Sequence, residues 1–598
     1  MNRTGVAAPP QQLRFLALAL AIAAGGGYLA WHMVQLQVVQ HADLRERAEA
    51  QGLRSRAVPA PRGSLYDAAG TPLAVSEPTW QVVCDPEYMG DKLRATVELS
   101  RLLGVPREEL RREFEQERNG RVVARGLREA EPGETDVIAA IRKLRLEGVR
   151  VEREWTRRYG QPGLAAHVLG VVGDGRGLAG IEQAMDEVLR GRDGRERSRV
   201  DAIGRPVGHE PAETEPARAG AHVQLTIDMA VQRRLEEALA EAVAKHAPLG
   251  ACGVVVRPST GEILAMASWP TFDPVQRTNL QPEALKNLVT SLNYEPGSTL
   301  KPLIAGAAVA DGISRWSESV FCENGVWTFR GRTIHDHSFK HGGHQHLTVV
   351  RGIALSDNIL MAKLGTRMGP PRLAWWVAHL GFGQRTGIAL PGEERGQVQP
   401  ASRFTLQGAC MSIPMGHEIA VTPLQLAMAH AAVANGGMWM PPRIVRRVWA
   451  VEDSGRERDL PAPALPEPRR FYQPADAAQI QDAMTSVMEE GTGKRAQLDG
   501  WTSAGKTGTT EKLVGGRYSK TNHIGSFVCW APADPGTAPA ALALIVVDDP
   551  QRKEHGHYGG QVAAPYVRDV LQFTLEHLQV PASPGAEAAP IRPARRPR

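Results

Sequence analysis

Cysteine is scarce in this sequence, and its few residues are scattered. Only five cysteines occur among 598 residues, and no two of them show the C-x-x-C spacing of a common zinc site. A zinc site built on these cysteines is therefore not expected. Cys252 and Cys529 lie within apolar runs, which predicts that both are buried as small hydrophobic side chains. The cysteines do not fix the cellular compartment.

The sequence also has little excess charge of one sign. Its 70 basic and 65 acidic residues leave a net charge of +5, and only twelve of the basic residues are lysines. So small an excess gives no basis for predicting nucleic-acid binding. With 42% hydrophobic and 23% charged residues, the composition is typical of packed globular structure rather than of disorder. The length predicts two or three domains.

An uncharged apolar run lies near the N-terminus, from Phe15 to Gln40. About twenty apolar residues suffice to span a bilayer, so the run qualifies as a transmembrane segment. A cleaved signal peptide, with Phe15–Ala24 as its apolar core, is the alternative. The apolar stretch continues to Val34, which favours a retained anchor over residues 15–40 behind a short head, 1–14. Positive charges on both sides leave the orientation open.

Two domains are expected after the anchor. Residues 41–215 are arginine-rich and hold no cluster of reactive groups, so they are interpreted as an elongated, non-catalytic pedestal with helical spacing over 93–105 and 134–149. The stretch 208–222, rich in Pro, Gly and Glu, is the candidate boundary. A second domain is expected over 221–578, and a disordered tail rich in Pro and Ala over 579–598.

The second domain shows an α+β pattern. An amphipathic helix capped by Asp228 is followed by two strands around a turn at 258–261. Two more strands are expected over 523–534 and 541–550, and a terminal helix over 564–578. The segments between are mostly helical, so a sheet split by a large helical insertion is predicted.

Three short motifs carry residues suited to acyl transfer. The first is Ser298 with Lys301, which share one face of a helix because they are three positions apart. A serine hydroxyl is a poor nucleophile until a base removes its proton, and Lys301 is placed to do so. The second motif is Ser356-Asp357-Asn358. Ser356 is a candidate proton relay, and Asn358 a candidate ligand for a substrate amide.

The third motif is Lys506-Thr507-Gly508-Thr509. Lys506, with the hydroxyls of Thr507 and Thr509, is expected to hold a substrate carboxylate and to raise the positive potential around the serine. Gly508 would let a substrate backbone lie against the strand. Each motif alone occurs by chance in many proteins, so the argument depends on finding all three together.

The third motif also has a competing interpretation. Residues Gly500–Thr507 fit the phosphate-loop pattern G-x-x-x-x-G-K-[ST]. That loop needs a buried strand before it and a helix straight after it. Here the preceding stretch is polar and glycines interrupt the following one, so an NTPase is not expected. Ser503 and Lys506 form a second Ser-x-x-Lys, but on a strand their side chains would face opposite sides.

A histidine-rich stretch between the first two motifs raises the possibility of a metal site, because histidine is the commonest metal ligand. Its potential ligands are His335, Asp336, His337, His341, His344 and His346. The favoured interpretation is a glycine-bearing polar loop near the catalytic cleft, with no metal. Metal analysis of the purified protein would decide between the two.

The order Ser-x-x-Lys, Ser-Asp-Asn, Lys-Thr-Gly resembles the signature of penicillin-binding proteins and serine β-lactamases. Arg62–Ala74 and Gly177–Gly194 resemble the two boxes of the non-catalytic module of class B penicillin-binding proteins, although the first has Asp67-Ala68 where Asp-Arg is usual. Further stretches resemble the transpeptidase domain; they are 223–232, 260–274, 294–302, 420–437 and 558–571. Within class B, the resemblance is closest to the division-specific enzymes.

This resemblance implies a D,D-transpeptidase that cross-links peptidoglycan stem peptides and is a target of β-lactams. Ser298 would be the nucleophile, the backbone N–H groups of Ser298 and Thr509 the oxyanion hole, and Thr507 with Thr509 the carboxylate site. Neither a metal nor an organic cofactor is implied. The catalytic domain would lie outside the cytoplasmic membrane, and a membrane glycosyltransferase and other division proteins would be partners.

Three other functions within the same fold stay open. An elongation-specific transpeptidase of the same class is the first, because the division role rests on likeness rather than on chemistry. A penicillin-hydrolysing or penicillin-sensing enzyme would share the motifs but usually lacks a large pedestal. A non-catalytic division scaffold would not need three intact motifs.

Overall fold

The computed structural model describes residues 11–44 and 53–584, apart from 117, 132, 133, 135, 174, 200–212 and 277–280. The chain divides into two units, Met1–Ala60 with Arg192–Arg218, and Pro61–Gly191 with Ala219–Arg598. The first unit holds two helical segments, α1 (Gln11–Val34) and η1 (Gln35–Val39), and a small antiparallel sheet. The strands of that sheet, in spatial order, are β1 (Leu53–Val58), β8 (Gly194–Arg199) and β9 (Glu213–Glu215).

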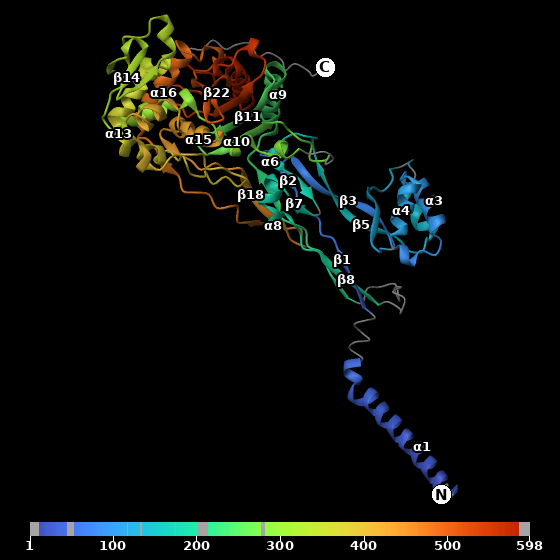
Figure 1. Ribbon diagram of the computed structural model, residues 1–598. Helices are drawn as coiled ribbons and strands as arrows, with labels where there is room; N and C mark the ends of the chain where they lie inside the picture. The colour runs from blue at the N-terminus through green and yellow to red at the C-terminus, as the bar shows by residue number, and fades with distance from the viewer. Residues whose placement is uncertain are drawn as a thin grey trace, which may run out of the picture. The chain divides into compact units, whose positions relative to one another are not determined.

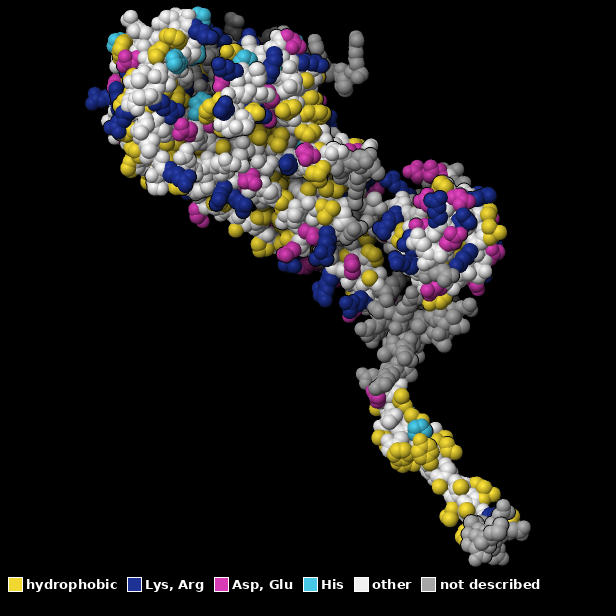
Figure 2. All heavy atoms as spheres, viewed as in Figure 1, with side chains coloured by type: hydrophobic (Ala, Val, Ile, Leu, Met, Phe, Trp, Pro, Cys, Tyr) yellow, Lys and Arg dark blue, Asp and Glu magenta, His cyan; other side chains and the backbone are white. Residues whose placement is uncertain are grey.

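The N-terminal helical segment matches the predicted anchor. Leu13–Val39 is long and apolar enough to cross a membrane, and Figure 2 shows hydrophobic side chains along its surface. A regular helix satisfies its own backbone hydrogen bonds, which is the condition for a single segment to cross hydrocarbon. The first ten residues of the predicted head lie outside the described residues.

The second unit begins with a long antiparallel ribbon, β3 (Pro72–Cys84) and β5 (Val149–Tyr159), which pair from Ala74↔Tyr159 to Cys84↔Val149. The ribbon ends in a small lobe (Figure 1) whose core is formed by Leu99, Phe114 and their neighbours. The lobe holds α3 (Lys92–Leu103), α4 (Arg107–Glu115), β4 (Arg121–Leu127) and α5 (Val137–Leu144). Both helices predicted from apolar spacing are confirmed. The ribbon was not predicted.

A buried ion-pair network connects the two boxes of the N-terminal module. The Arg62 guanidinium donates to Glu182 Oε2 at 2.5 Å and to Asp186 Oδ1 at 2.6 Å. Arg157 Nε on β5 donates to Glu182 Oε1 at 2.7 Å, and the Glu182 side chain is fully buried. Charge-assisted hydrogen bonds of this kind are shorter and stronger than those between neutral groups. The network therefore holds the start of the module to its end.

One sheet crosses the predicted domain boundary. Strand β10 (His222–Leu225) pairs in parallel with β2 (Leu65–Tyr66) and antiparallel with β18 (Val445–Val451). The sheet order is β19-β18-β10-β2-β3-β4, with β5 beside β3 and β19 spanning Glu457–Leu460. Strands from before and after the boundary thus share one hydrogen-bonded ladder, so the two segments are not joined by a linker alone.

The predicted second domain is built on a five-stranded antiparallel sheet of order β12-β11-β23-β22-β21 (Figure 1). The strands are β11 (Pro248–Arg257), β12 (Glu262–Trp269), β21 (Ala504–Val514), β22 (Arg517–Ala531) and β23 (Ala541–Pro550). Helices α9 (Met229–His246) and α18 (Ala564–His577) cover one face and pack against Val255, Phe527 and Ile545. The Asp228 carboxylate caps α9 through the N–H groups of Ala230 and Val231, as predicted.

The chain leaves this sheet after β12 and returns with β21, and the insertion between them is mainly helical. Its longer helices are α11 (Lys301–Ala310), α12 (Val349–Leu355), α13 (Asn358–His379), α15 (Pro423–Ala434) and α16 (Pro474–Glu489). They pack in one core with Val254, Val528 and Leu544 on the second face of the sheet. The predicted α+β arrangement with a split sheet is confirmed.

Two smaller predictions have opposite outcomes. The stretch Gly500–Thr507 runs directly into strand β21 where a phosphate loop needs a helix, so the prediction that it is not a phosphate loop is confirmed. The predicted disordered tail, in contrast, is wrong for its first residues. The N–H of Ser583 donates to Gly500 O at 2.9 Å and its Oγ donates to Asp534 Oδ2 at 2.5 Å. Residues 579–584 therefore belong to the folded part.

Candidate active site

Ser298 lies on a short 3-10 turn, η4 (Gly297–Leu300), which leads into α11. Gly297 has φ +57°, and a Cβ at this position would lie 2.7 Å from Thr510 Cγ2 on β21. Glycine is therefore required for the turn to lie against that strand. Ser298 is half-buried and lines a cleft, so its hydroxyl is accessible to a substrate.

Lys301 is the first residue of α11, and its side chain is fully buried. Its Nζ donates to Ser356 O at 2.5 Å, to Asn358 Oδ1 at 2.8 Å and to Ser356 Oγ at 3.3 Å. Burial lowers the pKa of Lys301 to about 8, against the opposing effect of the nearby carboxylates of Asp336 and Asp357. An amine with this pKa is able to lose its proton near neutral pH, as a general base must.

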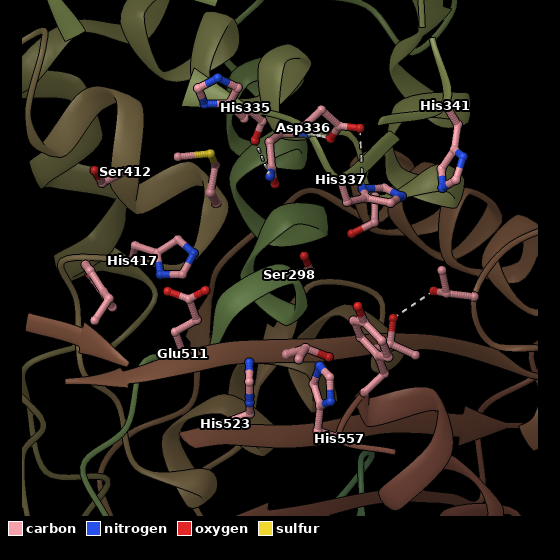
Figure 3. Close-up of a pocket in the computed structure, with 18 of the residues that line it drawn as sticks. Ser298, His335, Asp336, His337, His341, Ser412, His417, Glu511, His523 and His557 are labelled. Atoms are coloured by element: carbon pink, nitrogen blue, oxygen red, sulfur yellow. Dashed lines mark hydrogen bonds and ion pairs between the residues drawn. The ribbon is translucent and has the colours of Figure 1, made fainter. Parts of the chain in front are cut away.

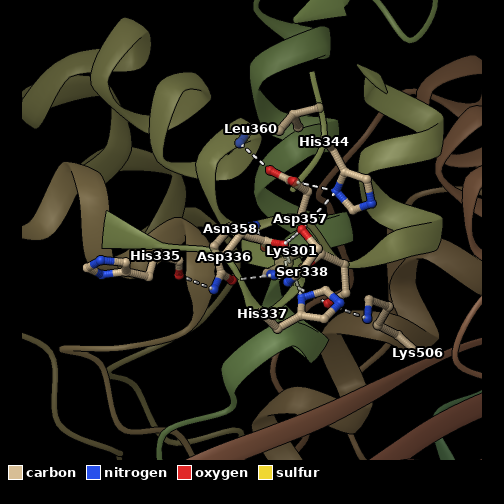
Figure 4. A network of polar contacts seen from close by, with 11 residues as sticks. Lys301, His335, Asp336, His337, Ser338, His344, Asp357, Asn358, Leu360 and Lys506 are labelled. Atoms are coloured by element: carbon tan, nitrogen blue, oxygen red, sulfur yellow. Dashed lines mark hydrogen bonds and ion pairs between the residues drawn. The ribbon is translucent and has the colours of Figure 1, made fainter. Parts of the chain in front are cut away.

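The Ser356-Asp357-Asn358 motif forms the connection between α12 and α13 (Figure 4). Ser356 adopts a left-handed conformation with φ +62° at the end of α12. Asp357 caps α13 by accepting a hydrogen bond from the N–H of Leu360 at 2.8 Å. Because Asp357 is held in this way, its two sequence neighbours, Ser356 and Asn358, both reach Lys301.

Lys506 reaches the same serine from the sheet. Its fully buried Nζ donates to Ser356 Oγ at 3.1 Å and to Thr507 O at 3.2 Å. Burial and the positive charge of Lys301 hold the pKa of Lys506 well below its usual value. Ser356 thus lies between two buried amines, which is the position that a proton relay requires.

Thr507 and Thr509 on β21 both line the cleft. Their hydroxyls already have partners, since Thr507 Oγ1 lies 2.7 Å from Thr492 Oγ1 and Thr509 Oγ1 accepts from the N–H of Gly559 at 3.0 Å. These contacts fix the orientation of both hydroxyls at the wall of the cleft. A hydroxyl has one donor and two acceptor positions, so both retain capacity for a ligand.

The role expected for Gly508 is wrong in its direction. A Cβ at this position would lie 2.4 Å from Ser526 Oγ, 2.8 Å from Pro296 O and 3.0 Å from Thr299 Cγ2. The missing side chain therefore faces the turn that carries Ser298, not the substrate side of the strand. Glycine is needed here because the strand and the serine turn approach each other closely.

All three motifs meet at one cleft of about 810 Å³ (Figure 3). Its walls include Ser298, Ser356, Asn358, Thr507 and Thr509. Lys301 and Lys506 are fully buried and are joined to the cleft through Ser356. One expected contact is not formed: among the described residues, the hydrogen bonds of Lys301 Nζ go to Ser356 and Asn358, and none goes to Ser298. Catalytic contacts commonly tighten only when a substrate is bound.

The cleft also has lining residues outside the three motifs. His335, Asp336, His337 and His341 come from the histidine-rich stretch, which confirms its predicted place near the cleft. Others come from segments far apart in the sequence and were not predicted; they are His417, Glu511, Tyr518, His523, His557 and Tyr558. The rings of His523 and His557 stack with centroids 4.1 Å apart (Figure 3). Single residues of this kind leave no local pattern in a sequence.

The titration of Lys301 predicts a pH dependence for acylation. Below its pKa of about 8 the amine is protonated and cannot accept the proton of Ser298, so the rate should fall as pH decreases. The rate should rise through pH 8 and then level off, whereas an ordinary lysine would require a pH above 10. The acylation rate would be measured between pH 6 and 10 from samples labelled with a fluorescent penicillin and quenched at fixed times.

Comparison with known proteins identifies the family. A model described as the penicillin-binding protein transpeptidase domain matches residues 251–572, and one described as the penicillin-binding protein dimerisation domain matches residues 57–225. The chain belongs to the penicillin-binding protein family. The expectation drawn from the three motifs is therefore confirmed. The dimerisation-domain match also includes both boxes quoted from the N-terminal module.

Curated relatives of this penicillin-binding protein span most of its length. It is 31% identical to stage V sporulation protein D of Bacillus subtilis over 87% of this chain and 78% of the relative. The probable peptidoglycan D,D-transpeptidase PbpC of Pseudomonas aeruginosa is 30% identical over 92% of both chains. The peptidoglycan D,D-transpeptidase FtsI of Escherichia coli is 29% identical over 94% of this chain and 90% of the relative.

Solved structures have the same fold. Penicillin-binding protein 3 of Mycobacterium tuberculosis in complex with aztreonam superposes with a TM-score of 0.66 at 27% identity, covering 89% of this chain and 99% of that one. A peptidoglycan synthetase from Bifidobacterium adolescentis gives a TM-score of 0.69 at 26% identity over 89% and 98% of the two chains. This penicillin-binding protein therefore has the class B architecture of an N-terminal module followed by a transpeptidase domain.

Proposed function

We propose that this penicillin-binding protein is a peptidoglycan D,D-transpeptidase that cross-links stem peptides during septal wall synthesis. The observation that carries the proposal is the position of Ser356. Its hydroxyl contacts two buried lysines, Lys301 and Lys506, in the wall of the cleft that Ser298 also lines. Buried lysines with lowered pKa values are rare outside sites that move protons.

In the first half-reaction, Ser298 Oγ attacks the carbonyl carbon of the penultimate D-alanine of a stem pentapeptide. Lys301, in its neutral form, takes the hydroxyl proton, and the backbone N–H groups of Ser298 and Thr509 stabilise the oxyanion. The peptide bond then breaks, and a proton delivered through Ser356 lets the terminal D-alanine leave as a neutral amine. An ester on Ser298 remains.

Substrate binding follows from the walls of the cleft. The carboxylate of the terminal D-alanine accepts hydrogen bonds from Thr507 and Thr509, with the charge of Lys506 behind them. The Asn358 amide, held by Lys301 and by His335 O, bonds the substrate backbone. In the second half-reaction the amine of a neighbouring stem attacks the ester carbonyl, and Ser298 recovers its proton.

A reaction with a defined donor and acceptor tests this function. The full-length protein in detergent is mixed with a stem pentapeptide that ends in D-Ala-D-Ala, with or without a stem-peptide amine acceptor. We expect release of D-alanine and, with the acceptor, a cross-linked product detected by mass spectrometry. Release of D-alanine with water as the only acceptor, in the presence of excess amine, would instead indicate a hydrolase.

The proposed function also implies where in the cell the protein acts. Because the substrate lies outside the cytoplasmic membrane, the segment Leu13–Val39 acts as a single-pass anchor and the catalytic domain faces the periplasm or outer surface. β-Lactams react with Ser298 in place of the stem peptide. A membrane glycosyltransferase that makes the glycan strand and other division proteins are the expected partners, and no nucleic acid is involved.

The septal role is tested by localisation. A fluorescent protein fused to the N-terminal head should concentrate at mid-cell in dividing cells, because a division enzyme works where the septum forms. The control is the same fusion carrying Ser298→Ala, which tests whether recruitment depends on activity. Signal distributed along the lateral wall would favour the elongation branch of class B instead.

A further inference from the structure

One acidic side chain in the wall of the cleft has no role in the reaction described so far. Glu511 lies on β21 and lines the cleft together with Thr507 and Thr509. Successive residues of a strand point to opposite faces, so these three side chains, spaced two positions apart, share one face of β21. Figure 3 shows the Glu511 side chain extending from the strand into the cleft, toward the His417 ring. His417 is itself bonded to Glu295, with 2.9 Å between Nδ1 and Oε2.

The Glu511 carboxylate differs in its contacts from the other charged groups of the cleft wall. The second acidic residue that lines the cleft, Asp336, accepts a hydrogen bond from the N–H of Asn358 at 2.8 Å. The arginine of the wall, Arg332, is paired with Glu418. Glu511 is exposed, and its carboxylate makes no hydrogen bond or ion pair with any residue that the structure describes. It is therefore available to a cation that enters the cleft.

The basic residues beside Glu511 do not supply that cation. Lys512 is paired with Asp548, with 2.6 Å between Nζ and Oδ1. His523 lies opposite Glu511 on β22, and its ring stacks on that of His557 with centroids 4.1 Å apart. Burial and the charge of His523 both lower the pKa of His557, and an ordinary histidine is largely neutral at pH 7. The negative charge of Glu511 is thus left for a ligand.

The direction of the bound substrate indicates which of its groups reaches Glu511. Strand β21 is at the edge of the five-stranded sheet, and an extended peptide can bind to such an edge as an added strand. In the proposed reaction the terminal carboxylate lies by Lys506 and Thr507, and the reacting carbonyl lies by the N–H of Thr509. The stem peptide then runs antiparallel to β21. Its next residue extends toward Glu511, which is about 7 Å beyond Thr509 at the usual rise of a strand.

We propose that the Glu511 carboxylate binds the side-chain ammonium of the third residue of the donor stem peptide, the residue before the two D-alanines. This inference rests on the proposed transpeptidase function. The attacking amine of the acceptor stem must be neutral, so a carboxylate that holds an ammonium suits the donor rather than the acceptor. Because like charges repel, Glu511 also selects against a third residue whose side chain ends in a carboxylate.

Two donor peptides that differ in one amine test the site. The full-length protein in detergent is given a stem pentapeptide with lysine as its third residue, or the same peptide with Nε-acetyllysine. The value of kcat/KM for D-alanine release is measured with glycine in excess as the acceptor, so that it reports the acylation half-reaction. We expect the wild type to prefer the free amine by about three- to tenfold, as for an ion pair in a cleft partly shielded from water. Added salt should reduce this preference.

Substitutions of Glu511 should change the preference in a defined direction. Glu511→Gln should accept both donors equally, because the amide carries no charge. Glu511→Lys should prefer the acetylated donor, because its ammonium repels the free amine. A reversed preference is a result that a loss of stability does not produce. Glu237→Gln is the matched control, since Glu237 is exposed on α9 and does not line the cleft, and it should keep the wild-type preference.

The possible results separate this inference from the proposed function. Release of D-alanine from neither peptide would contradict the proposed function, and the ammonium site with it. Release from both peptides with equal kcat/KM in the wild type would overturn the ammonium site alone. The donor assignment would also be wrong if Glu511→Gln slowed formation of the cross-linked product while its preference between the two donors stayed as in the wild type. Glu511 would then serve the acceptor.

Discussion

Ser298→Ala should abolish covalent labelling of the protein by a fluorescent penicillin. The hydroxyl of Ser298 is the nucleophile, and the variant has no atom at that position able to form the ester. Removing the hydroxyl oxygen leaves the half-buried turn otherwise unchanged, so the fold should be retained. The measurement is gel fluorescence after incubation to saturation, with thermal melting as the check on folding.

Ser503→Ala is the matched control, because Ser503 and Lys506 form the other Ser-x-x-Lys of the chain. Ser503 is buried and does not line the cleft, so this variant should label at the wild-type rate. Equal labelling of Ser298→Ala and the wild type would rule out the proposed mechanism. Loss of labelling only in Ser503→Ala would show that Ser503, and not Ser298, is the nucleophile.

Lys301→Ala should lower the second-order rate of acylation by about 10²- to 10⁴-fold, the usual contribution of a general base. The variant also removes the hydrogen bonds that hold Ser356 and Asn358, so its effect should lie at the upper end of this range. A time course of penicillin labelling, rather than its end point, measures the rate.

Lys301→Arg separates proton transfer from charge. Arginine keeps the positive charge but does not give up its proton in a protein, so this variant should be nearly as slow as Lys301→Ala. Lys363→Ala is the control, since Lys363 lies on α13 and pairs with Glu323 away from the cleft. An arginine variant with the wild-type rate would show that the residue acts through charge alone.

Much of the catalytic fold is predictable from sequence because its elements show strong local patterns. Val254 and Val255 on β11 are buried on opposite faces of the sheet, so the strand appears in the sequence as a continuous apolar run. The Asp228 cap marks the start of α9. The ribbon of β3 and β5 is different. Strand β5 is rich in arginine and glutamate, and polar residues and a proline interrupt the middle of β3, so no continuous apolar run reveals the ribbon.

The sequence predicts which residues form the site but not which contacts they make. Short motifs identify Ser298, Ser356 and Lys506, because their chemistry needs those residue types. Sequence does not show that Gly508 faces the serine turn, or that Lys301 bonds to Asn358 rather than to Ser298. The first depends on the approach of segments about two hundred positions apart and the second on residues 57 positions apart, and no local pattern encodes either.

The pairing of strand β10 on both of its edges affects how the protein responds to force. It is held on one edge by β2 from the N-terminal module and on the other by β18 from the transpeptidase domain. A load applied between these segments must shear a shared ladder of backbone hydrogen bonds before either can separate. Peeling away β2 would expose an unpaired edge on β10, so the two regions resist force and melt as one cooperative body.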